Sequence, residues 1–441
     1  MCSMYSYRTF DEMEVIDLDK KTDGTEICPK RFKGHEETKS VADVVKSLTE
    51  RVDENGIFSI CVTRDQMLER GIKQWQRQKK SSPKHPLRVS FIGEAGIDNG
   101  ALRKEFLTEM MAGIEKRFFD GGDNGKNPKY SMTDLDKHNF KTVGEIFAVS
   151  IAQGGPPPNF LMQWCYNYIS TGEVDQEAIS ERDVTDPELI QLIKEIEAAD
   201  NTTLMEFTDR ILSCGYTGAM STQRKEDIVR SLVLHSTVRL LPMLQQICSG
   251  MKLYGLLSLV QQETDICRQL FVPGSFSKMD SDFLVKSLSP VFSEKGTMRH
   301  QRESKVVNFL QDFIQDLEDE EEGGKNNRED MPEETKSEDE DIMKAERHTN
   351  NMNITVGKFC QWLTGQGHIP LSHSEREGFR IIIEFDHDCQ VRYGTHHSIC
   401  YPVVNACSCS VTFPIAHLST YVEFKNIISQ AIVHGFEFGR C

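Results

Sequence analysis

The sequence predicts an α+β protein in which a long, mostly helical region is followed by a small region of mixed helices and strands. Apolar residues recur at helical spacing over most of the chain up to Pro273. A strongly acidic stretch then interrupts this pattern. Beyond it, the β-branched and aromatic run of residues 379–385 is typical of a strand. These three observations divide the chain into two unequal regions.

Length and composition indicate a globular protein without a membrane segment. The 441 residues allow two or three domains, and 38% of them are hydrophobic. The thirteen cysteines are an odd number without recurring spacing. The first residues lack the basic start and apolar run of a secretory signal, so we expect no signal peptide, and no apolar run of about 18 residues occurs. We therefore expect reduced thiols, a location in the cytoplasm or the nucleus, and no membrane partner.

The formal net charge of −17 is concentrated in one segment. Between Asp312 and Asp341, fifteen Asp or Glu stand against three Lys or Arg. The remainder is nearly balanced and lacks the basic face that nucleic-acid binding requires, so we expect no nucleic-acid partner. Self-repulsion and the lack of apolar residues predict that residues 316–350 form a disordered insertion.

Residues 1–56 are polar with weak periodicity, and we expect a disordered or loosely attached arm. Within it, a short β-prone run flanked by acidic residues, with Val15, Ile16 and Leu18 at its centre, resembles a SUMO-interacting motif. In such motifs the strand adds to an exposed sheet edge of SUMO. Short apolar islands in tails also occur by chance, so the alternative that these residues bind nothing stays open.

The helical region is expected to begin with a strand, a helix and a second strand, at residues 57–63, 64–78 and 87–92. A Gly-rich turn follows at residues 93–100. It is not a phosphate loop, because no Gly-Lys-Ser/Thr follows it. The next helix carries an apolar residue at every fourth position from Leu102 to Phe118. Further helices are expected at residues 142–152, 160–169, 186–196, 203–214 and, with breaks, 225–270.

The small region is expected to contain helices at residues 303–314, 359–363 and 421–433. Residues 379–385 and 389–393 are predicted strands joined by an Asp-His-Asp turn. The last feature is residues 401–414, a short polar turn that holds Cys407 and Cys409 between an apolar run and a strand-like segment.

Three interpretations of this turn compete. The first is a zinc site, because His396, His397 and Cys400 lie close in sequence to Cys407 and Cys409. The Cys-x6-Cys-x-Cys spacing of the three cysteines lacks the paired Cys-x2-Cys spacing of structural zinc sites, so we expect no metal. A small core residue is the default for any cysteine. A nucleophilic thiol is the third interpretation, and it requires exposure and a lowered pKa.

A family resemblance favours the nucleophile. Tyr401-Pro402-x-Val404-x-Ala406-Cys407 followed by Val411-x-Phe413-Pro414 resembles the catalytic loop of HECT-type ubiquitin ligases. The spacing from Pro402 and to Pro414 fits Cys407 and does not fit Cys409. Two further stretches resemble motifs of the family, in the same order: Phe91-x-Gly93-Glu94-x-Gly96-x-Asp98-x-Gly100-x-Leu102-Arg103-x-Glu105-Phe106, and Thr364-Gly365 with Ile369-Pro370 and Gly378-Phe379. The resemblance covers residues 57–441 and is strongest to the divergent G2/M-phase-specific-like branch.

This resemblance implies a bilobal HECT domain with a mostly helical N-lobe at residues 57–295, a small α/β C-lobe at residues 300–441 and a hinge near Gly296. It implies that Cys407 accepts ubiquitin as a thioester from a conjugating enzyme, which docks within residues 186–220, and passes it to a substrate lysine. No cofactor is implied. Phe438 matches the phenylalanine that the family uses near its C-terminus to position the lysine transfer.

The sequence departs from the family pattern directly before the cysteine. Asn405 and Ala406 stand where the family usually has a His or Ser followed by a Thr. A hydroxyl that could polarise the site is therefore missing. The alternative to an active ligase is a catalytically weak or inactive HECT-like scaffold that binds proteins of the ubiquitin or SUMO pathways.

Overall fold

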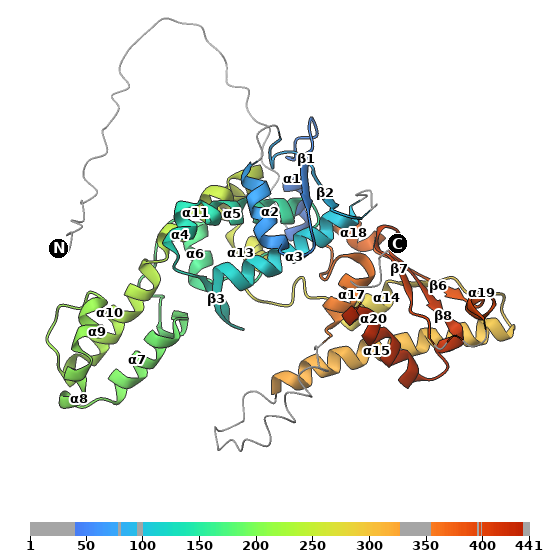
Figure 1. The fold of residues 1–441 in the computed structure, drawn as a ribbon. Coiled ribbons are helices and arrows are strands. Elements are labelled where there is room, and N and C mark those ends of the chain that lie inside the picture. The colour runs from blue at the N-terminus through green and yellow to red at the C-terminus, as the bar shows by residue number, and fades with distance from the viewer. Residues whose placement is uncertain are drawn as a thin grey trace, which may run out of the picture. The chain divides into compact units, whose positions relative to one another are not determined.

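The structure is a computed structural model that describes residues 40–77, 81–94, 100–326, 354–394, 397 and 399–434 (Figure 1). All of these residues belong to one compact unit, Thr38–Cys441. The candidate SUMO-interacting residues Val15, Ile16 and Leu18 lie outside the described residues, as does Phe438. Their predicted roles therefore rest on the sequence alone.

The buried hydrophobic side chains form two clusters, which we call the first and the second core. The first core takes its residues from Val41 to Val272, together with Leu371. The second core takes its residues from Met279 to Ala431. The chain thus passes from one core to the other between Val272 and Met279, earlier than the hinge expected near Gly296.

The segment that the sequence predicts to be the hinge, residues 294–302, lies within the part of the chain that builds the second core. Ser293 and Glu303 flank this segment, and the Ser293 amide donates a hydrogen bond to Glu303 at 2.7 Å. Strand β5 (Leu288–Pro290) lies before the segment and already pairs with the sheet of the second core. The hydrogen bond between Ser293 and Glu303 therefore holds the two ends of residues 294–302 together, and the hinge near Gly296 stays a prediction.

The first core begins with helix α1 (Val41–Thr49), within the segment expected to be a loose arm. Its buried residues Val41, Val44, Val45 and Leu48 follow the i, i+3, i+4, i+7 spacing of one helix face. The Ser40 side chain caps the helix by accepting a hydrogen bond from an amide of its first turn. Residues from 40 onward therefore belong to the folded unit, and the expectation of an arm extending to residue 56 is wrong.

A parallel strand pair follows at the predicted positions, β1 (Phe58–Val62) with β2 (Leu87–Phe91). Both strands alternate buried and exposed residues. Helices α2 (Met67–Arg77) and α3 (Ala101–Phe118) pack beside them, as the apolar periodicity predicts. Helix α2 connects the two strands, as parallel pairing requires a crossover.

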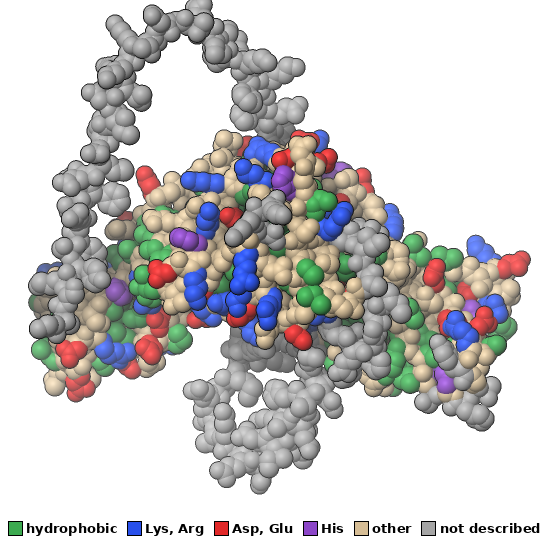
Figure 2. All heavy atoms as spheres, turned by 45° about the horizontal axis from the view of Figure 1, so that its top comes forward, with side chains coloured by type: hydrophobic (Ala, Val, Ile, Leu, Met, Phe, Trp, Pro, Cys, Tyr) green, Lys and Arg blue, Asp and Glu red, His purple; other side chains and the backbone are tan. Residues whose placement is uncertain are grey.

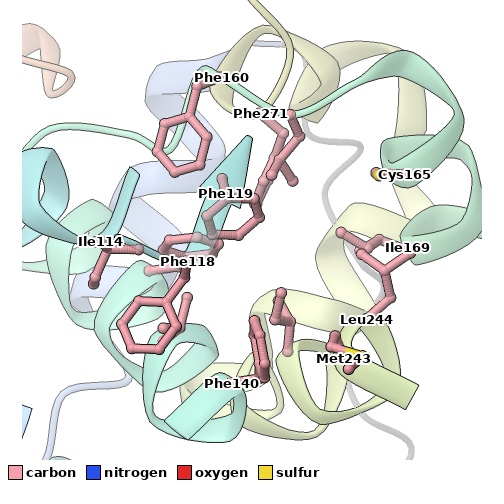
Figure 3. Close-up of a cluster of buried hydrophobic side chains, with 14 of the residues drawn as sticks. Ile114, Phe118, Phe119, Phe140, Phe160, Cys165, Ile169, Met243, Leu244 and Phe271 are labelled. Atoms are coloured by element: carbon pink, nitrogen blue, oxygen red, sulfur yellow. The ribbon is translucent and has the colours of Figure 1, made fainter. Parts of the chain in front are cut away.

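Helices α5 (Asn139–Ala152) and α11 (Leu241–Gly250) lie close together at the centre of the first core. Gly144 allows this approach, because a Cβ atom there would lie only 2.1 Å from the Ile247 carbonyl oxygen. Figure 3 shows the neighbouring aromatic side chains turned toward one another. The rings of Phe118 and Phe140 meet edge to face, with centroids 5.6 Å apart.

The remaining elements of the first core include a hairpin that the sequence pattern does not predict, and the expected helix 203–214 is divided at Phe207. They are β3 (Phe119–Gly122), β4 (Gly125–Pro128), α4 (Met132–Asp136), α6 (Gln163–Thr171), α7 (Pro187–Ala198), α8 (Asn201–Glu206), α9 (Thr208–Ser213), α10 (Lys225–Val238), α12 (Leu256–Gln262) and α13 (Thr264–Cys267).

The second core is built on a four-stranded sheet of order β5-β6-β8-β7. Strands β6 (Ile381–Asp386) and β8 (Ser410–Pro414) pair in parallel, and the short edge strand β7 (Val403–Asn405) is antiparallel to β8. The helices of this region are α14 (Ser281–Lys286), α15 (Met298–Asn326), α17 (Val356–Thr364), α18 (His373–Gly378), α19 (Cys389–Tyr393) and α20 (Tyr421–His434).

The strand predicted at residues 389–393 is wrong, because these residues form helix α19. Cys389 is buried at its start and Val391 is exposed. Five residues are too few for an alternating pattern to separate a strand from a single helical turn. The strand predicted at residues 379–385 is confirmed as β6.

Helix α15 continues to Asn326, although the sequence predicts a disordered insertion from residue 316. Acidic side chains of its second half have partners. Asp316 accepts hydrogen bonds from the Tyr421 hydroxyl at 2.5 Å and from Lys425 Nζ at 3.2 Å. Glu321 accepts one from the Val356 amide at 2.8 Å. These contacts offset the repulsion within the acidic run, so the helix extends further than its composition suggests.

Acidic and basic side chains both occur on the face of the molecule in view in Figure 2, separated by uncharged surface. Among the residues that the structure describes, no helix combines the length and the apolar character needed to cross a membrane.

Candidate functional site

Cys407 lies in the tight connection between strands β7 and β8. Residues Asn405 and Ser410 pair across the hairpin, which leaves a four-residue loop that contains the 3-10 turn Ala406–Ser408. Cys409 closes the loop with φ 47° and ψ 50°, in the left-handed region. Four-residue hairpin loops are usually built around such a tight turn. The loop therefore has a defined shape, with Cys407 in the middle of the turn.

Asn405 supports the turn from its N-terminal side. Its side-chain oxygen accepts a hydrogen bond from the Ser408 amide at 3.3 Å. The Ser408 hydroxyl lies 2.8 Å from that of Ser410, which adds a second link across the loop. Asn405 is thus a capping residue of the loop that carries the candidate nucleophile.

The structure distinguishes the two thiols of this loop. Cys407 is exposed, whereas Cys409 is partly buried and its Sγ lies 3.7 Å from the Ala406 carbonyl oxygen. Burial raises the pKa of the Cys409 thiol, and the positive charge of Lys104 opposes this only in part. A nucleophilic thiol has to be accessible and ionisable. Of the two, Cys407 meets the first condition and Cys409 meets neither fully.

The loop is fixed to the sheet behind it. The Ile382 amide on β6 donates a hydrogen bond to the Cys409 carbonyl oxygen at 2.9 Å. Directly after the loop, Val411 and Phe413 of β8 are buried in the second core. A reactive side chain that stands on a packed sheet is held in position more accurately than one on a long loop.

Helix α3 of the first core and helix α17 of the second core both lie next to the 3-10 turn at Cys407. Gln361 on α17 donates a hydrogen bond to Glu109 on α3 at 2.6 Å. Lys104, also on α3, lies 3.5 Å from Glu375. The turn that holds the candidate nucleophile is therefore next to residues of both cores.

The two other motifs of the family resemblance lie partly on these helices: Ala101 to Phe106 belong to α3, and Thr364 ends α17. Glu94 and Glu105 both bind Arg64, whose Nε lies 2.6 Å from Glu94 and whose Nη2 lies 3.3 Å from Glu105. At Gly365, which has φ +77°, a Cβ atom would lie 3.1 Å from the Ala101 carbonyl oxygen. These motif residues thus position α3 against its neighbours, a structural role that the sequence does not reveal.

Among the described residues, the thiols and imidazoles that lie close together in the sequence around Cys407 do not form one group, in line with the rejected zinc spacing. His396 lies outside the described residues, and neither Cys407 nor Cys409 joins a group of metal-ligating side chains among the described residues. Instead, two residues of that set meet two others from distant positions: Cys389, His397, Cys400 and His417. Sequence spacing does not predict this group, because Cys389 and His417 belong to separate elements.

No protein-family model matches the chain. Parts of the chain are similar to proteins named G2/M phase-specific E3 ubiquitin-protein ligase from three vertebrates. The protein of Macaca fascicularis is 24% identical over 260 residues, which cover 55% of this chain and 34% of the relative. That of Homo sapiens is 26% identical over 141 residues (31% and 20%), and that of Gallus gallus is 24% identical over 206 residues (44% and 28%).

These matches span about a third or less of the length of the relatives. Their identity is low but consistent, and all three relatives carry the same name. The chain is therefore a distant relative of proteins named E3 ubiquitin-protein ligases.

Proposed function

We propose that this chain is a HECT-type ubiquitin ligase that accepts ubiquitin from a conjugating enzyme as a thioester on Cys407 and transfers it to a substrate lysine. The observation that carries the proposal is the exposed thiol in the middle of a short, capped hairpin loop. The family resemblance assigns the nucleophile to the same residue. The distant relationship to proteins named E3 ubiquitin-protein ligases supports the same activity.

The proposed chemistry consists of two acyl transfers. The Cys407 thiolate attacks the carbonyl carbon of the thioester that joins ubiquitin to the conjugating enzyme, and the cysteine thiolate of that enzyme leaves. One thioester replaces another, so this step is close to energy balance. The unprotonated amine of a substrate lysine then attacks the new thioester, the carbon–sulfur bond breaks as the amide bond forms, and the proton that the amine loses ends on the departing Cys407 sulfur or in solvent. By the resemblance, Phe438 positions this second step.

The short helices α8 and α9 are the proposed docking region for the conjugating enzyme. They lie within residues 186–220, the range that the resemblance implies. Met205 on α8 and Leu212 on α9 are large apolar side chains that are about half exposed, at 56% and 49%. Exposed apolar side chains on neighbouring elements are typical of protein-binding surfaces. Replacing both by Asp should weaken transfer from the conjugating enzyme without changing the Cys407 loop.

The second candidate function is a HECT-like scaffold that binds ubiquitin-pathway proteins without forming a thioester. The observation that favours it is the identity of the two residues before Cys407, Asn405 and Ala406. The Asn405 side chain is engaged by the Ser408 amide, and Ala406 offers only a methyl group. Neither residue supplies a free hydroxyl beside Cys407, so an oxyanion formed during transfer would lack that donor.

An adduct assay separates the two functions. The full chain is incubated with ubiquitin, activating enzyme, ATP and a panel of conjugating enzymes, and the products are separated with and without reductant. We expect a reductant-sensitive ubiquitin adduct that Cys407→Ala abolishes and Cys409→Ala retains. Cys407→Ser should convert it into an oxyester that resists reductant.

Two results would contradict the proposal. The absence of any adduct with the wild-type chain across the panel would favour the scaffold. An adduct that survives Cys407→Ala and disappears in Cys409→Ala would show that the proposal assigns the chemistry to the wrong thiol.

A further inference from the structure

We propose that Cys389, His397, Cys400 and His417 bind one zinc ion. Each of the four residues offers one ligand atom, and all four atoms lie within 4.8 Å of one another. Two thiolates and two imidazoles are a standard tetrahedral donor set for structural zinc. Soft sulfur ligands exclude the hard cations calcium and magnesium, which prefer oxygen.

The spacing of the ligands is close to that of an occupied site. Zinc–sulfur bonds of about 2.3 Å and zinc–nitrogen bonds of about 2.0 Å place tetrahedral ligand atoms roughly 3.3 to 3.8 Å apart. The longest separation within the group therefore has to shrink by only about 1 Å. Side-chain rotation alone can supply such a change.

The two imidazoles already point toward a common centre. The Nε2 atoms of His397 and His417 lie 2.8 Å apart, and the ring planes cross at 78°. Two ring nitrogens at this distance share a proton when no metal is bound. A zinc ion would replace that proton and bind both nitrogen lone pairs.

The second nitrogen of His397 has the partner that zinc-bound histidines usually have. Its Nδ1 lies 2.6 Å from the Gly394 carbonyl oxygen, which can only accept a hydrogen bond. The proton is therefore on Nδ1, and Nε2 is left with a lone pair for the metal. A backbone carbonyl in this position fixes the tautomer and the ring orientation of a metal-binding histidine.

The ligands come from three places in the chain. Cys389 begins helix α19, His397 and Cys400 lie in the segment before strand β7, and His417 ends the 3-10 turn after β8. His397 and Cys400 are separated by two residues, a spacing that lets neighbouring ligands bind one ion. The described residues between Gly394 and Pro402 include no helix or strand.

The proposed ion thus links helix α19, the irregular segment before β7 and the 3-10 turn after β8. It would cross-link the edge of the sheet from which the Cys407 loop extends. This role is structural, and it does not depend on the ligase activity proposed above. The zinc site has its own readout, so its failure and that of the ligase proposal can be distinguished.

A disulfide between Cys389 and Cys400 is the main rival use of these thiols. Both residues are free thiols in the structure. The nearby carboxylate of Asp386 is paired with Arg392, so it is engaged elsewhere.

The test measures metal in the full-length chain, purified without chelators. Elemental analysis should find about one zinc per chain, and Cys400→Ser and His417→Gln should each lower this at least fivefold. Cys407→Ser and Cys409→Ser are matched controls that remove a thiol from the neighbouring loop and should retain the zinc. Cobalt-substituted protein should have the visible bands of tetrahedral cobalt with thiolate ligands.

A second measurement needs no variant and so does not depend on the folding of one. With zinc bound, Cys389 and Cys400 should resist alkylation by N-ethylmaleimide, and a chelator should remove this protection. Wild-type chain without zinc and without cobalt bands would overturn the proposal. So would stoichiometric zinc in Cys400→Ser, loss of zinc in the Cys409→Ser control, or a Cys389–Cys400 disulfide in freshly purified protein.

Discussion

The side chain of Asn405 accepts a hydrogen bond from the amide of Ser408, so that it spans the turn that holds Cys407. The same position is where the sequence departs from the HECT pattern. The departure therefore has a structural consequence: Asn405 caps the turn. Asn is among the best residues for this task, because its short side chain reaches an amide two or three residues ahead.

Removing this cap should loosen the loop without unfolding the protein. Asn405→Ala should lower the stability of the folded loop by about 0.5 to 2 kcal/mol. The rate of the proposed ubiquitin transfer to Cys407 should fall roughly two- to thirtyfold, because about 1.4 kcal/mol corresponds to a factor of ten. Single-turnover transfer from a charged conjugating enzyme measures this. Asn405→Ser keeps an acceptor and should recover most of the rate. Equal transfer rates in wild type and Asn405→Ala would show that the Asn405 cap does not affect the reaction of Cys407.

The two neighbouring thiols should differ in reactivity. Cys407 is exposed, while burial raises the pKa of Cys409 above its usual value and shields the sulfur. At about pH 7.5, alkylation by iodoacetamide should modify Cys407 at least tenfold faster than Cys409. Mass spectrometry of timed digests gives both rates, and Cys61, exposed on β1, is the internal reference. Comparable rates at Cys407 and Cys409 would mean that the loop opens freely in solution.

A buried carboxylate should make the second core sensitive to acid. Glu303 accepts hydrogen bonds from the Ser293 hydroxyl at 2.5 Å and lies 2.6 Å from His387 Nε2. Burial acts to raise the pKa of Glu303, but the hydrogen bonds from Ser293 and the contact with His387 outweigh it and hold the pKa below the usual 4.5. The stability that this carboxylate contributes is therefore present above about pH 4.5 and is lost as the pH falls through the lowered pKa.

Glu303→Gln tests this dependence. At neutral pH it should lower the free energy of unfolding of the second core by about 2 kcal/mol, because a hydrogen-bonded buried charge is lost. The difference from wild type should shrink as the pH is lowered from about 5 to about 3. Urea unfolding at several pH values measures both effects. Ser293→Ala removes only the hydroxyl donor to Glu303, so it should lower the free energy of unfolding by a smaller amount with the same pH dependence. A difference that grows at low pH would contradict the assigned sign.

Much of the fold could be predicted because the apolar residues recur in the sequence at clear helical or strand periods. Strand β1 lies where apolar and polar residues alternate, and helices α2 and α3 lie where apolar residues recur at helical spacing. The pattern is misleading at helix α19 because five residues fit both periods. The extension of α15 depends on Tyr421 and Lys425, which lie far along the chain. Local composition cannot report such tertiary partners.

The candidate site is predictable in part for a similar reason. The spacing of Pro402 and Pro414 is a property of the sequence, and it favours Cys407 over Cys409. The direction of each thiol depends on the left-handed backbone of Cys409, which a residue other than Gly rarely adopts and a sequence does not reveal. The group of Cys389 and His417 with His397 and Cys400 is not predictable, because the fold alone brings these segments together.

The close approach of α5 and α11 should make Gly144 one of the least tolerant positions of the first core. A Cβ atom there would lie 2.1 Å from the Ile247 carbonyl oxygen and 2.9 Å from its carbon, and backbone cannot move aside as a flexible side chain can. The two helices would have to separate. Gly144→Ala should therefore lower the free energy of unfolding by about 3 kcal/mol.

Gly323 supplies a matched control with the opposite sign. It also lies in a helix, α15, but an added Cβ atom would have no neighbour within 4 Å. Alanine is the better helix former by up to about 1 kcal/mol, so Gly323→Ala should leave the protein as stable or slightly more stable. Thermal and urea unfolding of both variants measure the contrast. If Gly144→Ala were as stable as Gly323→Ala, the two central helices could not be packed as closely as the structure has them.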